Sequence, residues 1–272
     1  MKTIIQHSPN LEIAIQIASL HDCNVKQYNS HIRLYTNQEV DLDILRQDYQ
    51  MDFNYLPDSF DFKRVALFVS DMDSTLINIE CIDEIADFSG FKPQVASITE
   101  RAMQGELDFN TSLVERVALL KGLNVEVLNK VYTERLQVNP GGKELIQFFK
   151  SKSIKSAVVS GGFTYFTDRL AKDIGLDHSR ANVLEVDNNR LTGITQGDIV
   201  NAAAKAEFVH ELCALYSIDA NQVIVVGDGA NDLEMMNVAG LSIAYHAKRI
   251  VAEQADIAIN VGGLDKIMDL FD

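Results

Sequence analysis

The sequence has few basic residues and no long apolar run, and both absences narrow the possible functions. Only 24 lysines and arginines stand against 39 acids in 272 residues, which gives a formal net charge of −15. Nucleic acids and anionic membranes bind basic protein surfaces, so this charge argues against either partner. No apolar segment approaches the roughly 18 residues that span a bilayer, and no secretory apolar core follows Met1. We therefore expect a cytoplasmic protein.

Cysteine and histidine are also scarce, and their spacing excludes several kinds of site. Cys23, Cys81 and Cys213 lie far apart, and their odd number suits neither a disulfide framework nor a CxxC metal site. The six histidines show no HxxxH or HxE pattern, so a zinc site or a Ser-His nucleophile has no support. The segment 141–143 lacks the first glycine of a nucleotide-binding P-loop and is followed by Glu144. The chemistry must come from other residues.

Hydrophobic periodicity divides the chain into three regions, with no repeat and no glycine-serine linker between them. Residues 1–62 read as strand, helix, strand, strand, helix, strand, an order typical of a ferredoxin-like α+β domain. Residues 79–151 show helical spacing only. The segments 63–78 and 152–272 contain short apolar runs that alternate with helices, which predicts a parallel α/β sheet with one antiparallel hairpin around residues 187–189.

Two acids, Asp71 and Asp73, follow directly after the apolar run of residues 65–69. A continuous apolar run predicts a strand buried on both faces, and parallel sheets keep their ligands at the carboxyl ends of such strands. Two carboxylates are costly to place there unless a cation or a reacting group balances them. The alternative is an ordinary strand-to-loop turn, in which aspartate is common.

Two further apolar runs, 157–159 and 223–226, also end in polar turns that contain glycine. In a parallel sheet these ends meet at one edge, so we expect Asp228, in the turn after the second run, to lie close to Asp71 and Asp73. A cluster of carboxylates is a hard-oxygen site that suits Mg²⁺, and the spacing of a calcium-binding EF-hand is absent. The sequence therefore predicts a magnesium site at this edge.

The same edge also carries residues that suit an anion. Gly161 and Gly162 let backbone N–H groups approach a ligand, and Ser160 adds a hydroxyl, although a plain turn explains these residues too. Lys205 shares the apolar face of a helical segment with Phe208, where a buried lysine is unfavourable unless it meets an anion. The alternative is a surface lysine whose stem covers apolar neighbours.

Together these segments resemble the motifs of the haloacid dehalogenase (HAD) superfamily phosphatases. Residues 71–75 resemble its DxDx[TV] motif, residues 160–162 its second motif, Lys205 its third and residues 227–232 its fourth. The segment after the first motif, and the segment from Arg101 through Phe109 to Arg116, are similar to those of the phosphoserine phosphatases within that superfamily. The likeness covers residues 63–272 and implies a Rossmann-like parallel-sheet core, 63–78 and 152–272, with an inserted helical-bundle cap, 79–151.

The resemblance also implies a role for each residue of the core. Asp71 would be the nucleophile that forms an aspartyl-phosphate, and Asp73 would be the acid and base. Mg²⁺ would be held by the Asp71 and Asp228 carboxylates and the Asp73 carbonyl, with Asp232 orienting these ligands. The phosphoryl group would be bound by Ser160, Gly161 and Lys205. Gly162 and Asn231 would contact the substrate.

Residues of the cap would choose the substrate. In the family context Glu80 suits the ammonium group of phosphoserine and Arg116 its carboxylate. Without that context, a helix-capping Glu80 and a solvated or ion-paired Arg116 are the ordinary explanations. Met103 and Phe109 would close an apolar lid, with core packing as the alternative.

The expected activity is the hydrolysis of O-phospho-L-serine to L-serine and phosphate, the last step of serine biosynthesis. Two alternatives remain open: hydrolysis or phosphotransfer on another small phosphomonoester, and a non-enzymatic regulator that binds an amino acid. Residues 1–62 resemble a reduced ACT-like module, whose first strand-to-helix turn, residues 6–10, lacks the glycine of ligand-binding versions. We expect this module to pack on the catalytic part or to form a homodimer.

Overall fold

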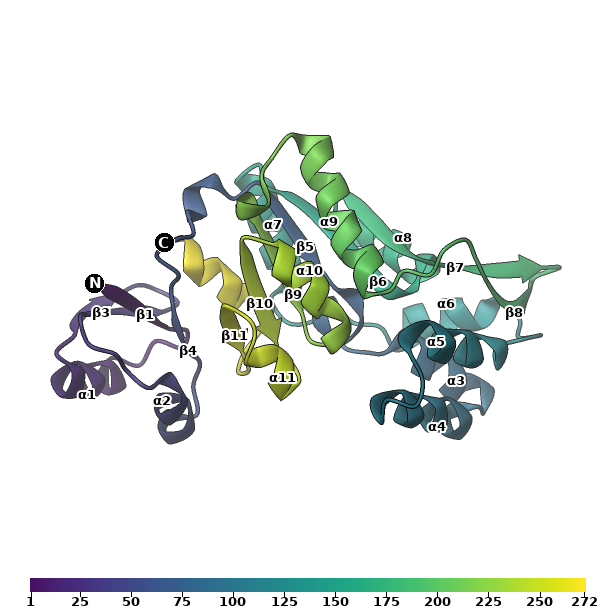
Figure 1. The fold of residues 1–272 in the computed structure, drawn as a ribbon, viewed down its shortest axis with the longest axis horizontal. Coiled ribbons are helices and arrows are strands. Elements are labelled where there is room, and N and C mark those ends of the chain that lie inside the picture. Colours follow the sequence, from purple (N-terminus) through teal and green to yellow (C-terminus); the bar gives the residue numbers. More distant parts are fainter.

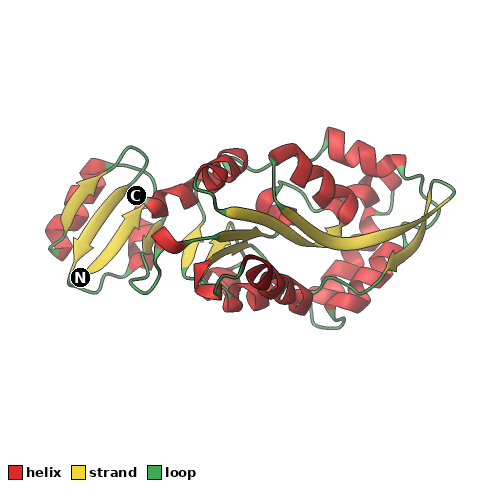
Figure 2. Ribbon diagram, turned by 90° about the horizontal axis from the view of Figure 1, so that it is seen from above, coloured by secondary structure: helices red, strands yellow, loops and turns green.

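The computed structural model describes all 272 residues and contains two β-sheets in an elongated molecule (Figure 1). A four-stranded sheet lies at one end, and a seven-stranded sheet occupies the middle. Helices cover both sides of the larger sheet, as the view from above shows (Figure 2). The mixed α/β class predicted from the sequence is confirmed. None of the helices is both long enough and apolar enough to cross a bilayer.

The small sheet and its two helices form what we call the N-terminal module. Its elements are β1 (Lys2–Gln6), α1 (Leu11–His21), β2 (Asn24–Gln27), β3 (Ile32–Thr36), α2 (Leu42–Tyr49) and β4 (Phe53–Tyr55). The strand order is β2-β3-β1-β4 with every neighbouring pair antiparallel, which confirms the predicted ferredoxin-like, ACT-like arrangement. Asn10 and Asp41 begin the two helices, because their side chains accept hydrogen bonds from backbone N–H groups of the first turn.

The large sheet has the strand order β11-β10-β9-β5-β6-β7-β8. Its strands are β5 (Leu67–Ser70), β6 (Lys155–Phe163), β7 (His178–Asp187), β8 (Arg190–Gln196), β9 (Val223–Gly227), β10 (Leu241–Tyr245) and β11 (Ile257–Ile259). All neighbours are parallel except β7 and β8, which form the predicted hairpin. Every residue of β5 and β9 is buried, as expected for central strands covered on both faces.

Helices pack on both faces of this sheet and complete a Rossmann-like core. They are α8 (Thr164–Ile174), α9 (Ala202–Tyr216), α10 (Leu233–Val238) and α11 (Arg249–Ala252), with the 3-10 helices η1 (Phe62–Arg64), η3 (Ala220–Gln222), η4 (Ala230–Asp232) and η5 (Leu264–Phe271). Two separate clusters of buried apolar side chains lie on the two faces, and the N-terminal module has a third cluster of its own. Strand β5 leads into a kinked helical turn, η2 (Met72–Leu76), which carries the chain towards the cap.

The segment after η2 is entirely helical, as predicted. It contains α3 (Cys81–Ser89), α4 (Lys92–Met103), α5 (Phe109–Ala118), α6 (Glu126–Glu134) and α7 (Gly142–Ser151). Helix α3 packs on α4 and α6, α4 packs on α5, and α5 contacts the end of the hairpin at β8. Helix α7 instead packs on β6 and η5, so the helical layer beyond the sheet edge consists of α3 to α6. The division of the chain into domains stays a prediction.

The N-terminal module contacts the free edge of the large sheet. The side-chain amide of Asn54 both donates to the carbonyl and accepts from the N–H of Ala258 in β11, each at 2.9 Å. The carboxylate of Asp52 accepts the backbone N–H groups of Asn260 and Val261 at 2.9 and 2.7 Å. These bonds satisfy backbone groups that an edge strand otherwise leaves unpaired.

Candidate active site

Three strand ends meet where the sequence predicted the site. Strand β5 lies between β6 and β9, and the Asp71 N–H donates to the carbonyl of Val226 in β9 at 2.9 Å. Asp71 is the first residue after strand β5, and this hydrogen bond holds it next to the turn that carries Asp228. Residue 74 has a positive φ of 57°, which is uncommon for serine and turns the chain sharply after Asp73.

Lys205 lies beneath this edge and is completely buried. Its ammonium group contacts the Asp71 carboxylate and lies 2.7 Å from Oδ1 of Asp232. The other Asp232 oxygen accepts the backbone N–H groups of Asp228 and Gly229 at 3.2 and 3.0 Å. Burial alone would lower the pKa of Lys205, but Asp232 and Asp71 raise it, so the lysine stays charged. The alternative of a surface lysine is wrong.

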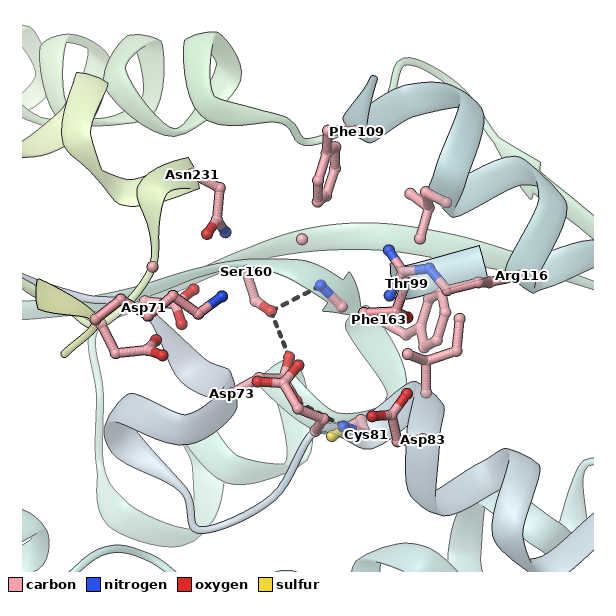
Figure 3. Close-up of a pocket in the computed structure, with 18 residues that line it drawn as sticks. Asp71, Asp73, Cys81, Asp83, Thr99, Phe109, Arg116, Ser160, Phe163 and Asn231 are labelled. Carbon is pink, nitrogen blue, oxygen red and sulfur yellow. Dashed lines mark hydrogen bonds between the residues drawn. The ribbon is translucent and has the colours of Figure 1, made fainter. Parts of the chain in front are cut away.

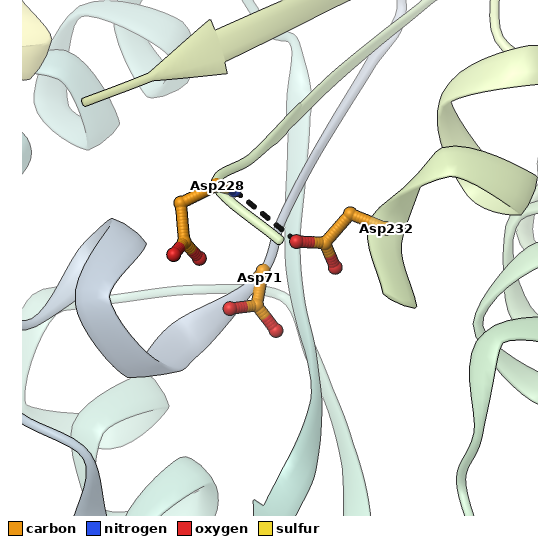
Figure 4. A group of neighbouring side chains, drawn as sticks. All are labelled: Asp71, Asp228 and Asp232. Carbon is orange, nitrogen blue, oxygen red and sulfur yellow. Dashed lines mark hydrogen bonds between the residues drawn. The ribbon is translucent and has the colours of Figure 1, made fainter. Parts of the chain in front are cut away.

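Three carboxylates gather around this lysine and could hold a metal ion (Figure 4). One oxygen each from Asp71, Asp228 and Asp232 lies within 4.8 Å of the others. Burial raises the pKa of Asp71 well above its usual range despite Lys205, and burial followed by Asp232 raises the pKa of Asp228 to about 6. One lysine does not balance three acids. A divalent cation with a preference for oxygen ligands fits the remaining charge, and Mg²⁺ is such an ion.

Asp73 points away from that cluster towards strand β6 (Figure 3). Its two carboxylate oxygens accept from the Cys81 N–H at 2.8 Å and from the Ser160 hydroxyl at 3.0 Å. Burial raises its pKa although these hydrogen bonds oppose the shift. A Cβ atom on Gly162 would lie 2.6 Å from Asp73 Oδ2, so only glycine permits this approach. Asp73 is thus held in place by two hydrogen bonds, and its raised pKa makes it a stronger proton acceptor than an ordinary aspartate.

The acids open into a pocket of about 300 Å³ between the sheet edge and the cap. Asp71 and Arg116 lie at opposite ends of it (Figure 3). Arg116 on α5 donates through Nε to the Ser112 carbonyl at 3.2 Å, and none of the ion pairs in the structure includes its guanidinium. Phe109, at the start of the same helix, covers Gly161, where an added Cβ would lie 2.7 Å from the ring. The pocket therefore has an unpaired cation at its cap end.

Glu80 lies at the start of α3 and also faces this pocket. Its carboxylate accepts a hydrogen bond from the Ser74 hydroxyl at 2.7 Å. Enclosure by the surrounding protein, and then the nearby Asp73, raise the pKa of Glu80 to about 8. A positively charged group beside it would restore the ionised form.

Most of the residues predicted from the sequence line this single pocket. They are Asp71, Asp73, Glu80, Phe109, Arg116, Ser160, Gly161, Gly162, Asp228 and Asn231. Lys205 and Asp232 lie directly below, and the Lys205 ammonium group contacts both Asp71 and Asp232. The exception is Met103, which is not among the lining residues and is 71% exposed at the end of α4. Met103 therefore makes no contact with the pocket in this structure, and its role in a lid stays a prediction.

Some residues of the site were not assigned a role from the sequence. The Thr75 hydroxyl donates to Asp228 Oδ1 at 3.1 Å, and the DxDx[TV] pattern could have suggested it. Asp83 and Thr99 line the cap side of the pocket. Lys248, which also lines the pocket, follows strand β10. Its position after a fourth parallel strand end is the signal that could have found it.

A Rossmann-like sheet with an aspartate cluster at its edge, closed by a helical layer, defines a hydrolase of the HAD type. The family model described as haloacid dehalogenase-like hydrolase matches residues 65–240. A phosphoserine phosphatase of Albidiferax ferrireducens is 53% identical over 216 residues, which cover 78% of this chain and 90% of the relative. This chain therefore belongs to the phosphoserine phosphatase family of haloacid dehalogenase-like hydrolases.

Solved structures agree with this assignment. A probable phosphoserine phosphatase from Vibrio cholerae, in unliganded form, is 34% identical with a TM-score of 0.86, and the match covers 99% of this chain and 85% of that one. A substrate-bound phosphoserine phosphatase complex is 39% identical with a TM-score of 0.72, over 76% of this chain and 99% of that one. The first likeness includes the N-terminal module.

Proposed function

We propose that this protein hydrolyses O-phospho-L-serine to L-serine and phosphate, the last step of serine biosynthesis. The observation that carries the proposal is the single pocket with buried acids at one end, the unpaired Arg116 at the other, and Glu80 in its lining. Phosphoserine has a phosphate, an ammonium and a carboxylate group, and each finds a group of suitable charge here. Relatives named phosphoserine phosphatase support the same substrate.

The reaction proceeds in two displacements at phosphorus. A carboxylate oxygen of Asp71 attacks the phosphorus atom, the bond to the serine oxygen breaks, and Asp73 donates a proton to that oxygen. Asp73, now ionised, takes a proton from water. The water oxygen attacks the aspartyl-phosphate at phosphorus and releases phosphate and the Asp71 carboxylate. The raised pKa of Asp73 supports its role as the proton donor in the first step.

Phosphoryl oxygens are held by groups at the ends of β6 and α9. Ser160 and the Gly161 N–H donate from one side, and the Lys205 ammonium, already in contact with Asp71, adds positive charge from below. Asn231 lies on the opposite wall of the pocket and Gly162 beside Asp73, both next to the bound phosphate. These fixed donors stabilise the charge that the three equatorial oxygens carry in the transition state.

Mg²⁺ fits the donor set, and we assign its ligands to the Asp71 and Asp228 carboxylates and the Asp73 carbonyl. When bound, the ion neutralises charge on the transferring phosphoryl group. Asp232 orients this set, since its oxygens are already taken by Lys205 and by two backbone N–H groups. Thr75 holds Asp228 from the other side.

The decisive experiment measures phosphate release from a panel of small phosphomonoesters, with Mg²⁺ and with a chelator. We expect phosphoserine to have the highest kcat/KM and the chelator to abolish turnover. Asp71→Asn should reduce kcat by at least about 10³-fold, because an amide cannot act as the nucleophile. Higher kcat/KM for a sugar phosphate would refute the substrate, and binding of phosphoserine without turnover would favour an amino-acid-binding regulator.

The N-terminal module lies at the opposite end of the molecule from the cap helices α3 to α6 (Figure 1). We propose that it packs on the sheet edge and forms a homodimer contact, and light scattering of the full chain and of a variant lacking residues 1–62 tests the second part. The cytoplasmic location stays a prediction.

A further inference from the structure

A lysine that the proposed reaction does not use lines the same pocket. Lys248 lies next to Asp228 and Gly229 in the pocket wall, and its side chain is exposed. None of the ion pairs in the structure includes it. The next residue, Arg249, is different, because it pairs with Glu253 just after α11 at 2.6 Å and does not line the pocket. Lys248 is thus an unpaired cation next to Asp228, which no ion pair in the structure includes.

The backbone of Lys248 is fixed from two sides. Its N–H donates to the carbonyl of Asp228 at 3.1 Å, which joins the loop after β10 to the loop after β9. Its own carbonyl accepts the N–H groups of Val251 and Ala252 at 2.9 and 3.1 Å, in the first turn of α11. The Cα atom is therefore held at the rim of the acid cluster while the ammonium group remains free of protein partners.

The charges along the pocket explain why a cation is needed at this rim. Five lining residues are acids, namely Asp71, Asp73, Glu80, Asp83 and Asp228. The only lining cations are Arg116, at the cap end, and Lys248, while Lys205 is buried below the floor. An anion that enters past five acids is repelled unless a positive group offsets them. Near Asp228 the protein's own positive group is Lys248, which adds to the charge of the Mg²⁺ that we assign to Asp71 and Asp228.

We propose that Lys248 is a phosphate-binding residue of this pocket, whose ammonium group attracts the substrate phosphate and contacts one of its oxygens. The identity of the substrate in this inference rests on the proposed function. The binding of a phosphate group by Lys248 does not, because any small phosphate would serve as the ligand. The same charge opposes a divalent cation beside Asp228. Loss of the charge should therefore weaken phosphate binding and strengthen Mg²⁺ binding, two effects of opposite sign.

The test compares Lys248→Met, Lys248→Gln and Lys248→Arg with the control Arg249→Met, which removes the same charge one residue away. We measure the inhibition constant of inorganic phosphate, KM and kcat for phosphoserine, and Mg²⁺ affinity by calorimetry without phosphate. For the two neutral variants we expect a rise of about three- to tenfold in KM and in the phosphate constant, with kcat changed less than about twofold. Their Mg²⁺ dissociation constant should fall, Lys248→Arg should behave as wild type, and added salt should narrow the differences.

Two results would overturn the proposal. One is that Lys248→Met and Arg249→Met change KM and the phosphate inhibition constant equally, which would show that only the net charge of the protein matters. The other is weaker binding of both phosphate and Mg²⁺, which would indicate a distorted loop. If wild type prefers another phosphomonoester, the proposed substrate fails, yet the phosphate and Mg²⁺ titrations still decide the role of Lys248.

Discussion

In the proposed function, different side chains of the pocket bind different charged groups of the substrate. No ion pair in the structure includes Arg116, although the charge of Asp83 acts on it, so its guanidinium is available for a substrate carboxylate. Glu80 lines the same pocket and is the candidate partner for an ammonium group. Arg116 is thus a charge without an ion-pair partner, whereas Glu80 already accepts a hydrogen bond from Ser74. We propose that selectivity among phosphomonoesters depends on these two residues, which are not required for the chemistry at phosphorus.

Arg116→Ala should separate recognition of the substrate carboxylate from the chemistry at phosphorus. Loss of the guanidinium leaves a substrate carboxylate unpaired, so we expect KM for phosphoserine to rise by about 10²-fold. O-phosphoethanolamine has the same phosphate and ammonium groups but no carboxylate, and its kcat/KM should change less than about threefold. Steady-state kinetics on both esters measure this. Equal losses on both would show that Arg116 supports the fold of the cap and does not read the substrate.

The state of Glu80 predicts a pH dependence of substrate binding. Enclosure raises the pKa of Glu80 to about 8, so the fraction of the carboxylate that is ionised increases as pH rises towards that value. Only the ionised form pairs with an ammonium group, and KM for phosphoserine should therefore fall between pH 6 and pH 8. Water contact at Glu80 and the substrate charge both favour ionisation, which places the midpoint below 8. Glu80→Gln should have a higher KM without this trend, and a trend of the same size in that variant would contradict the assignment.

At the scale of elements, the end of strand β6 decides how closely acid and hydroxyl approach. Ser160, Gly161 and Gly162 are the residues of this strand that lie near Asp73. In the same stretch, between Val159 and Phe163, the pairing of β6 with β7 shifts register. The two glycines leave room for different neighbours, since one faces Asp73 and the other faces Phe109 of the cap. One strand thus fixes both the proton donor and the position of the lid.

Substitution of the two glycines should have distinct consequences. In Gly162→Ala the new Cβ would lie 2.6 Å from Asp73 Oδ2, so Asp73 must move and kcat should fall by about 10²-fold or more. In Gly161→Ala the Cβ clashes with the Phe109 ring at 2.7 Å, and we expect mainly a rise in KM because the cap cannot close fully. The two variants have the same added volume and control for each other in kinetics and thermal unfolding. Identical kinetic profiles would contradict the separate roles.

At the scale of the whole molecule, a buried polar cluster joins the N-terminal module to η5. Asp269 accepts hydrogen bonds from Ser30 and contacts His7 at 3.3 Å, and the guanidinium of Arg33 donates to the Asp269 carbonyl at 3.1 Å. His31 lies 3.6 Å from the same carboxylate. Burial alone would raise the pKa of Asp269, but His31, His7 and Ser30 lower it to about 2. The junction therefore depends on an ionised aspartate.

That lowered pKa predicts acid sensitivity of the junction. In the unfolded chain Asp269 becomes protonated near pH 4, whereas in the folded chain it becomes protonated only near pH 2. The contribution, about 2 kcal/mol of the free energy of unfolding, is complete above pH 4 and is lost as pH falls towards 2. Asp269→Asn should be less stable at pH 6 and should lose less stability on acidification. Urea unfolding at pH 6, 4 and 3 measures the difference, and parallel pH curves would exclude this role.

Much of the fold was predictable because its signals are local. Apolar runs such as 223–226 specify buried strands by composition, and the first 62 residues have a regular alternation of strand and helix signals. The core of the site was predictable for a related reason: parallel strands bring their carboxyl ends to one edge, so residues far apart in sequence, such as Asp71 and Asp228, must lie close together.

Other features had no local signal. The packing of α7 on β6 and η5 depends on which side of the sheet the chain crosses, and helical periodicity does not contain that information. Met103 sits at helical spacing suited to a lid, but the end of α4 leaves it in solvent. Lys248 has an ordinary lysine context in sequence and reaches the site only through the order β9-β10 in the sheet.

The sequence by itself determined which chemical groups meet at the sheet edge, since the identity and spacing of the acids, the glycines and Lys205 already predict a site for phosphoryl transfer there. Only the tertiary structure decided which charges remain unpaired. Lys205 is neutralised by Asp71 and Asp232, whereas Arg116 and Lys248 keep free charges that face the pocket. The physical reason is that ion pairing and burial depend on distances between elements, which no local pattern of residues encodes.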